Sequence, residues 1–392
     1  MARRGNLFAH AASSSDARAC YQQKKEAIFM NLSFHLPTQI HLEEHAVRNH
    51  PEAFRLGRHA LLVTGRSSAK KNGSQDDVLA VLQEDGIEAS LFDEVASNPD
   101  IPTCYRGAEY AKKVGADFII AIGGGSPMDA GKTIALLAAA PRARGDLFRA
   151  PYEAALPIVA IPTTSGTGSE VTPYAILSDD EERTKRSIAS PLLFPRTALL
   201  DPRYQVQLPR RATVNTALDA LSHNVESMLS KRRTPLSSAI AASGVQAFQT
   251  ACPHLIEDCL TREDRASLLY ASLVGGIAIA QTATNIVHAL GYSLTYFRHI
   301  DHGRANALTL GAYLRFLERR CPGATAPVAA AADLPLGKLA GEVAALLGTR
   351  EEFTPEELRS YVPYARASAN SHGAIVDPSE AELLALYEKS LL

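Results

Sequence analysis

The 392-residue chain lacks several features that mark specialised classes of protein. No apolar run reaches the roughly 20 residues that a transmembrane helix needs, so we expect no membrane partner. The formal net charge is only −2, which gives nucleic acid or an anionic membrane surface no attractive field. The five cysteines are odd in number and scattered. Reduced thiols in a cytoplasmic protein are therefore expected, in place of a disulfide framework or a thiolate metal site.

The N-terminal segment lacks both periodicity and the apolar core of a signal peptide. Residues 1–29 are polar and contain arginine and a run of serines, as transit peptides do. Glu26 and the missing apolar, arginine-studded face count against a transit peptide. We interpret residues 1–29 as a poorly structured extension that arises from an upstream start codon or is dispensable, and expect activity to survive its deletion.

The next part of the chain alternates two patterns, short apolar runs and helical segments. Strands are expected at about 59–64, 88–92, 117–122 and 157–161. A capping box at Ser74 is expected to start the first of the intervening helices. Strands separated by helices predict a parallel sheet covered on both faces. An α/β dinucleotide-binding domain is therefore predicted for residues 30–204.

Strand signals stop after about residue 205, and alanine- and leucine-rich stretches follow with helical spacing. Helices are expected at about 212–230, 236–258, 264–292, 303–320, 328–347 and 379–391. A chain of this length exceeds one ordinary core. We therefore predict an all-α second domain over residues 205–392.

A glycine cluster lies between an expected buried strand and a helix. Its sequence is Gly123-Gly124-Gly125-Ser126-Pro127-Met128-Asp129. Glycines let the backbone approach a ligand, and the free N–H groups of a helix start favour a phosphate. A plain strand-to-helix turn is the alternative, and the spacing is not the G-x-G-x-x-G of an ordinary Rossmann fingerprint. The alternating pattern around the cluster favours pyrophosphate binding.

A second loop, rich in hydroxyls, follows the next strand. It runs Pro162-Thr163-Thr164-Ser165-Gly166-Thr167-Gly168-Ser169-Glu170 and could instead be an ordinary solvated loop. Two such loops at the carboxyl ends of parallel strands would line one crevice, where open α/β sheets bind ligands.

The turn after the first strand, residues 65–73, bears on the choice of cofactor. It contains hydroxyls and cations where a ribose with a free 2′-hydroxyl usually meets an acidic side chain. This composition favours NADP over NAD, although a solvated basic turn has the same composition.

Four side chains in the second half are candidate metal ligands. Asp219 and His223 are four residues apart and would share one helix face. His288 and His302 are separate in sequence, so a site with all four would close only on folding. One carboxylate and three imidazoles suit a divalent transition metal. Each residue alone has an ordinary structural explanation, and His299 is the chief rival to His302.

Taken together, these motifs resemble the iron-containing, or group III, alcohol dehydrogenases from about Ser33 to the C-terminus. The resemblance rests on the two loops above and on Asp219-Ala220-Leu221-Ser222-His223, His288-Ala289-Leu290-Gly291 and His302-Gly303-Arg304-Ala305-Asn306. It implies an active site in the cleft between the two domains, where Asp219, His223, His288 and His302 bind one catalytic metal. The metal is expected to be Fe²⁺, although Zn²⁺, Co²⁺ or Ni²⁺ also suit the ligands. The resemblance also implies a homodimer.

The turn and loops, together with positions matched through the resemblance, give a set of expected cofactor contacts. These are Gly65, Ser67, Ser68, Asn98, Pro99, Gly123, Gly124, Gly125, Ser126, Asp129, Thr163, Thr164, Ser169, Lys185 and Leu200. Residues 65–73 resemble the NADP-using branch of the family.

Three positions depart from the family pattern. Tyr292 stands where some members have a further histidine, and Ala217 where glycine is common. Ser371-His372-Gly373 replaces a frequent Asn-Pro-Arg near the substrate pocket, so the resemblance does not identify the substrate.

The expected activity is hydride transfer between a primary alcohol, or its aldehyde, and NADP(H), with a metal that polarises the substrate oxygen. Three alternatives remain open at this point. They are a glycerol-type polyol dehydrogenase with Zn²⁺ and NAD, a lyase similar to 3-dehydroquinate synthase, and a catalytically silent NADP-binding protein.

Overall fold

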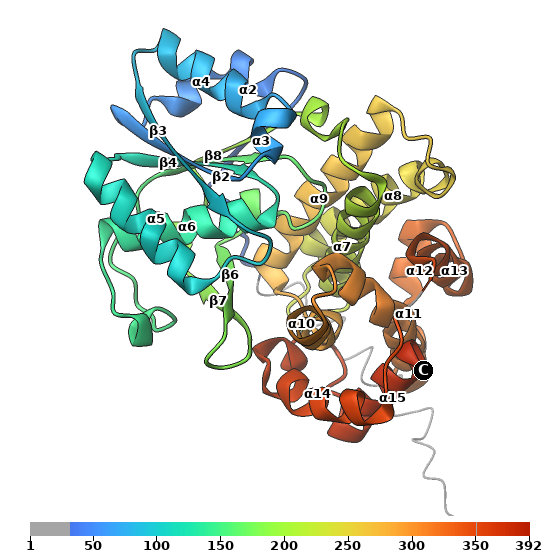
Figure 1. Ribbon diagram of the computed structural model, residues 1–392. Coiled ribbons are helices and arrows are strands. Elements are labelled where there is room, and N and C mark those ends of the chain that lie inside the picture. The colour runs from blue at the N-terminus through green and yellow to red at the C-terminus, as the bar shows by residue number, and fades with distance from the viewer. Residues whose placement is uncertain (1–31, 350) are drawn as a thin grey trace, which may run out of the picture.

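The computed structural model describes residues 32–349 and 351–392. The expected extension, residues 1–29, lies outside them. Figure 1 shows a sheet with flanking helices beside a second region built of helices. Among the described residues, no single helix is long and apolar enough to cross a membrane. The helices Arg262–Thr282 and Ile286–Arg298, bent by 110° relative to each other, reach that length and apolarity only together.

Six parallel strands form the central sheet in the order β1-β8-β5-β4-β2-β3. The strands are β1 (Gln39–Leu42), β2 (His59–Gly65), β3 (Glu88–Val95), β4 (Phe118–Gly123), β5 (Ile158–Pro162) and β8 (Thr197–Leu200). Inner strands such as β4 are buried along their whole length, as expected for a parallel sheet covered on both faces.

Helices cover both faces of this sheet because successive side chains of a strand point to opposite sides. The helices of this region are α2 (Ala46–Asn49), α3 (Ser68–Lys71), α4 (Ser74–Glu84), α5 (Ile101–Val114) and α6 (Gly125–Ala139). Leu61 and Val63 pack in one apolar cluster with α5 and α6, whereas Ala60 and Leu62 pack in another with α2 and α4. Short 3₁₀ helices are η1 (Pro51–Phe54), η2 (Arg144–Asp146), η3 (Ser169–Val171), η4 (Pro191–Leu193) and η5 (Pro202–Gln205). The predicted α/β architecture is confirmed.

The second region is helical and is built around one apolar cluster that includes Phe248, Tyr313 and Tyr387. Its helices are α7 (Arg210–Met228), α8 (Pro235–Glu257), α9 (Arg262–Thr282), α10 (Ile286–Arg298), α11 (His302–Arg320), α12 (Ala326–Ala332), α13 (Leu336–Leu347), α14 (Pro355–Ala367) and α15 (Glu380–Leu391), with the 3₁₀ helix η6 (Ala369–His372). The predicted helical architecture of this part is confirmed as well.

Two of the expected long helices are in fact broken. Within 264–292, the first helix ends before Ala283, whose φ of 54° cannot continue a helix. A new helix, α10, starts after Asn285, whose side chain accepts a hydrogen bond from the backbone N–H of Ile286. The stretch 328–347 breaks at Asp333, which has a φ of 51°, and at Pro335. The first break matters for function because it redirects the chain at the start of α10, just before His288.

Sequence reasoning also missed several elements and misplaced a cap. The sheet strands β1 and β8 were not expected, and neither was the antiparallel hairpin of β6 (Tyr174–Asp179) and β7 (Thr184–Ala189). The helices α2, α3 and α14 were not expected either. Ser74 does not form a capping box, because Gly73 occupies the N-cap position and no side chain caps that helix.

Gly303 sets how closely α11 approaches α7. A Cβ at this position would lie 1.9 Å from the carbonyl oxygen of Asn215 and 2.7 Å from Cβ of Asp219. The two helices carry three of the expected metal ligands, so this contact bears directly on the site.

Gly303→Ala is expected to lower the free energy of unfolding by about 1–3 kcal/mol or more, because the methyl group overpacks a helix contact. The matched control is Gly311→Ala on the same helix, where the nearest atom would be 3.5 Å away. The control should gain roughly 0.5–1 kcal/mol from helix propensity. Chemical denaturation measures both, and equal effects of the two substitutions would contradict this account of the contact.

Candidate active site

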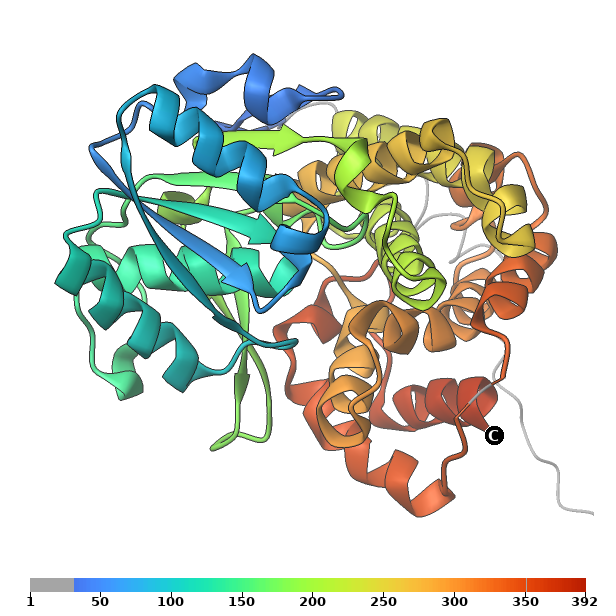
Figure 2. The same cartoon turned by 45° about the horizontal axis from the view of Figure 1, so that its top comes forward.

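A cleft of about 1450 Å³ lies between the carboxyl edge of the sheet and the helical region. Strands β2, β4 and β5 end there at Gly65, Gly123 and Pro162. Figure 2 shows the strands, in blue to green, directed toward the helices in yellow to red. The cleft therefore has a wall of loops on one side and a wall of helices on the other.

The four predicted metal ligands meet in this cleft. Asp219 and His223 lie one turn apart on α7, His288 is in the first turn of α10, and His302 is the first residue of α11. One ligand atom each from Asp219, His288 and His302 lie within 4.8 Å of one another. His223 completes the group, since its Nε2 is 2.9 Å from Nε2 of His288.

Hydrogen bonds fix which ring nitrogen faces the centre. Nδ1 of His223 lies 3.1 Å from the carbonyl oxygen of Gly166, which can only accept, so this nitrogen carries the proton. Nδ1 of His288 likewise donates to the carboxylate of Glu226. The Nε2 lone pairs of both rings are thereby turned toward each other. One carboxylate oxygen and imidazole Nε2 atoms gathered at one buried point are a donor set that fits a divalent metal.

The charges of the cluster support the same conclusion. Burial alone would raise the pKa of Asp219, but the neighbouring His223, His302 and His288 lower it to about 2. Burial and the nearby Lys185 hold the pKa of His302 well below its ordinary value. A charged Asp219 and a neutral His302 are the protonation states that bind metal. Burial would also lower the pKa of His288, but the Glu226 carboxylate instead raises it, so a metal would displace a proton from that ring.

Two partners of the cluster were missed by sequence reasoning. Besides holding His288, the Glu226 carboxylate accepts a hydrogen bond from the backbone N–H of Val287, at 2.7 Å. Asn306 directs its Nδ2 to within 2.8 Å of Oδ1 of Asp219 and 3.0 Å of Nε2 of His288. Each follows a ligand on the same helix, Glu226 by three residues and Asn306 by four, so helical spacing could have identified them.

The structure places His302 in the ligand cluster and His299 outside it. His299 is exposed in the left-handed C-cap of α10 and takes no part in the cluster. Tyr292 lines the cleft and stacks on His302, with ring centroids 5.5 Å apart. Burial raises the pKa of its phenol, which therefore stays protonated at neutral pH.

Most of the expected cofactor contacts also line the cleft. These are Gly65, Ser68, Asn98, Pro99, Gly124, Gly125, Ser126, Asp129, Thr164, Ser169 and Lys185. The glycine loop packs against the hydroxyl loop so closely that a Cβ on Gly125 would lie 2.6 Å from Cγ2 of Thr167. Only backbone fits at that point, and the first N–H groups of α6 are open to a phosphate.

Four of the expected contacts are not among the residues that line the cleft. Ser67 is exposed at the start of α3. Gly123 and Thr163 lie behind the loop surface, where the N–H of Thr163 donates to the carbonyl oxygen of Gly123. Leu200 is fully buried in an apolar cluster with Val171.

A buried lysine, Lys132, and a half-buried lysine, Lys185, organise the wall of the cleft. Lys185 donates to Oδ1 of Asn98 at 2.9 Å, and burial lowers its pKa to about 8. Lys132, which sequence reasoning did not select, lies on α6 and donates to the carbonyl oxygens of Ser169, Thr172 and Tyr174 at 2.6 to 2.9 Å. It therefore fixes the hydroxyl loop to the helix that follows the glycine loop.

Two family models match consecutive parts of the chain. The model of iron-containing alcohol dehydrogenases matches residues 37–202, and that of the C-terminal part of the same family matches residues 213–346. This chain belongs to the iron-containing alcohol dehydrogenase family. Proteins similar to this chain in sequence and in structure agree with that assignment.

An NADPH-dependent butanol dehydrogenase of Clostridium saccharobutylicum is 32% identical over 66% of this chain and 68% of its own length. Alcohol dehydrogenase 4 of Saccharomyces cerevisiae is 32% identical over 77% of this chain and 76% of its own. The crystal structure of an iron-containing alcohol dehydrogenase from Thermotoga maritima superimposes with a TM-score of 0.86 at 36% identity, over 92% of this chain and 99% of that one. The protein is therefore an oxidoreductase of the alcohol and aldehyde class.

Replacement of Glu226 tests the orientation of His288. Glu226→Gln removes the carboxylate that accepts the Nδ1 proton, and we expect metal affinity to fall by about 10- to 100-fold. Competition with a chromogenic chelator measures the affinity. Ser222→Ala on the same helix is the control, because among the described residues the Ser222 hydroxyl bonds only to the carbonyl of Leu218. Wild-type affinity in Glu226→Gln would show that the carboxylate does not orient the ligand.

Proposed function

We propose that this enzyme is a metal-dependent alcohol dehydrogenase, or aldehyde reductase, that transfers a hydride between a primary alcohol or its aldehyde and NADP(H). The observation that carries the proposal is the position of the Asp219, His223, His288 and His302 cluster in the same cleft as the glycine loop. Fe²⁺ is the proposed metal, and Zn²⁺ also suits the ligands.

The side chains around the cluster have separate tasks in this proposal. When bound, the metal supplies a Lewis acid that polarises the substrate oxygen. Asp219, His223, His288 and His302 would hold it, while Gly166 and Glu226 keep the protons of two imidazoles on Nδ1. Tyr292 would keep a proton on its phenolic oxygen beside the cluster.

The cofactor would lie across the loops at the carboxyl ends of the strands. The backbone at Gly124 to Ser126 and the start of α6 suit the pyrophosphate, and the chain aligns the reacting carbons by holding cofactor and substrate in one cleft. NADP is favoured over NAD because Gly65 places no acid beside the ribose. The nearby Arg66, Lys70 and Lys71 are exposed and form no ion pair within the described residues.

The proposal is tested by removing the metal anaerobically, adding back Fe²⁺ or Zn²⁺, and following NADPH oxidation with a short-chain aldehyde. We expect activity with metal and none with buffer. His302→Ala should abolish turnover while NADPH binding, measured by fluorescence, stays near the wild-type level. His299→Ala, three residues away and outside the cluster, should remain active. An active His302→Ala variant would refute the ligand assignment, and inactivity under every condition would favour the lyase or silent alternatives.

The cofactor preference is tested by placing an acid where the ribose phosphate would lie. A side chain fits at Gly65, since its Cβ would lie 3.4 Å from the nearest atom. In Gly65→Asp we expect the ratio of kcat/KM for NADPH to that for NADH to fall about tenfold or more, because a carboxylate repels the 2′-phosphate. Gly337→Asp, at an exposed and open position far along the chain, adds the same charge and should leave the ratio unchanged. An unchanged ratio in Gly65→Asp would place the 2′-position elsewhere.

A further inference from the structure

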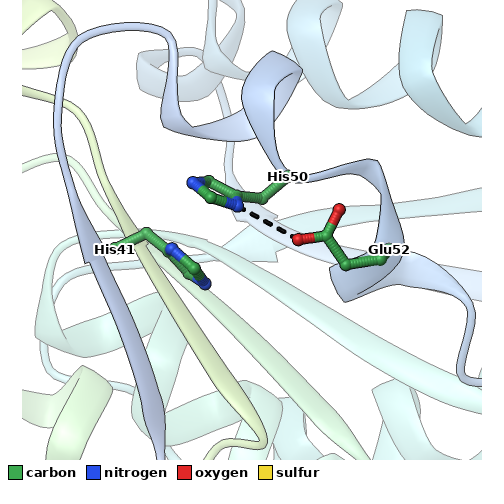
Figure 3. Close-up of side chains that lie close together, drawn as sticks. All are labelled: His41, His50 and Glu52. Carbon is green, nitrogen blue, oxygen red and sulfur yellow. Dashed lines mark hydrogen bonds and ion pairs between the residues drawn. The ribbon is translucent and has the colours of Figure 1, made fainter.

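A second group of metal-binding side chains lies outside the cleft, at the edge of the sheet. It consists of His41, His50 and Glu52, one ligand atom from each lying within 4.8 Å of the others. Figure 3 shows the three side chains converging, His41 from β1, His50 from the residue between α2 and η1, and Glu52 from η1. None of the three is among the residues that line the cleft.

The backbone on both sides of this group is held in place. His41 belongs to β1, which pairs in parallel with β8 along four residues. The N–H of His50 donates to the carbonyl oxygen of Ala46, and Pro51 follows at once. The ligands therefore project from two fixed segments, and closing around an ion requires only side-chain rotation.

The two ring nitrogens of His50 are each hydrogen-bonded to a carboxylate. Nδ1 of His50 lies 3.0 Å from Oε1 of Glu52, and Nε2 lies 2.7 Å from Oε1 of Glu43. Metal-binding histidines commonly bind the ion through one nitrogen and donate from the other to a carboxylate. With Glu52 on the ion, Glu43 is in place to accept the remaining His50 proton.

A simple ion pair accounts for only part of the arrangement. A protonated His50 between two carboxylates would explain Glu43 and Glu52, but it gives no role to His41. The His41 ring stacks on that of His50 with centroids 3.5 Å apart, and neither of its nitrogens has a hydrogen-bond partner among the described residues. An imidazole with a spare lone pair beside a second imidazole and a carboxylate is a donor set for zinc-type ions.

We propose that His41, His50 and Glu52 form a second divalent-metal site of the zinc type, distinct from the catalytic cluster. Two imidazoles and one carboxylate select such an ion over Mg²⁺ or Ca²⁺, which prefer oxygen ligands. Zn–N and Zn–O distances near 2.0–2.2 Å bring ligand atoms to roughly 3.4 Å apart, so the rings must turn from their stacked contact toward a shared edge. The exposed Glu52, with 55% of its side chain accessible, leaves the ion a path from solvent.

The site is tested with Zn²⁺ on the full chain whose catalytic site has first been loaded with one equivalent of Zn²⁺ and then desalted. Isothermal titration should reveal a second equivalent in the wild-type protein. His41→Ala and His50→Ala should lose it and keep the first. Glu52→Gln, an exposed substitution that leaves both imidazoles intact, should weaken the second event. His45→Ala is the control, because His45 lies between the ligands in sequence, is exposed and is not in the group.

Retention of the first equivalent in every variant shows that the fold is intact, so loss of the second is specific. Anomalous diffraction from a Zn²⁺-soaked crystal should place the ion between His41 and His50. One equivalent of Zn²⁺ in total for the wild-type protein would overturn the proposal. A second equivalent that survives in His41→Ala and His50→Ala would also overturn it and assign the ion to other residues.

Discussion

The active site depends on the two buried acceptors that hold a pair of imidazoles with their Nε2 atoms facing one point. Nε2 of His223 and Nε2 of His288 lie 2.9 Å apart, and each ring is held in that tautomer by an acceptor on its Nδ1. Neither ring can relieve the contact by moving its proton without losing a buried hydrogen bond, which is costly. The folded chain thus gathers imidazole donors at one point, around which three helices and one sheet loop are arranged.

The same constraint explains features at a distance from the ligands. The break at Ala283 to Asn285 turns the chain so that α10 starts at the cluster, and the Glu226 carboxylate meets the first N–H groups of that helix. A negative group at a helix start is favourable in itself. One buried carboxylate therefore both positions α10 and fixes the tautomer of its histidine.

Local sequence predicted the fold well where a pattern has a single physical interpretation. Apolar runs followed by glycine gave the strands near 59–64 and 117–122, and helical periodicity gave α7, α8 and α11. It failed where backbone geometry decides, as at Ala283 and Asp333, whose positive φ values no periodicity reveals. The short hairpin β6–β7 was also missed, although β6 alternates half-buried and buried residues as a strand with one covered face does, and it packs against α6.

In the candidate site, too, local sequence predicted some features and missed others. Asp219 and His223 could be paired from helical spacing, but their meeting with His288 and His302 rested on resemblance until the fold brought the helices together. Glu226 and Asn306 follow the ligands His223 and His302 at helical spacing, which would have identified them. Leu200 illustrates the opposite error, since a position matched through a family pattern proves to lie in an apolar cluster and not in the cleft wall.

The bonds of Lys132 have a consequence for how the cleft can open. This side chain ties α6 to the backbone at Ser169, Thr172 and Tyr174, and Tyr174 begins the hairpin that carries Lys185. α6, the hydroxyl loop and the hairpin are thereby joined into one packed unit by a single buried cation. The hydroxyl loop in turn accepts the Nδ1 proton of His223 at the Gly166 carbonyl and packs closely on Gly276 of α9. A motion that opened the cleft at this loop would therefore break the contact that fixes the tautomer of His223.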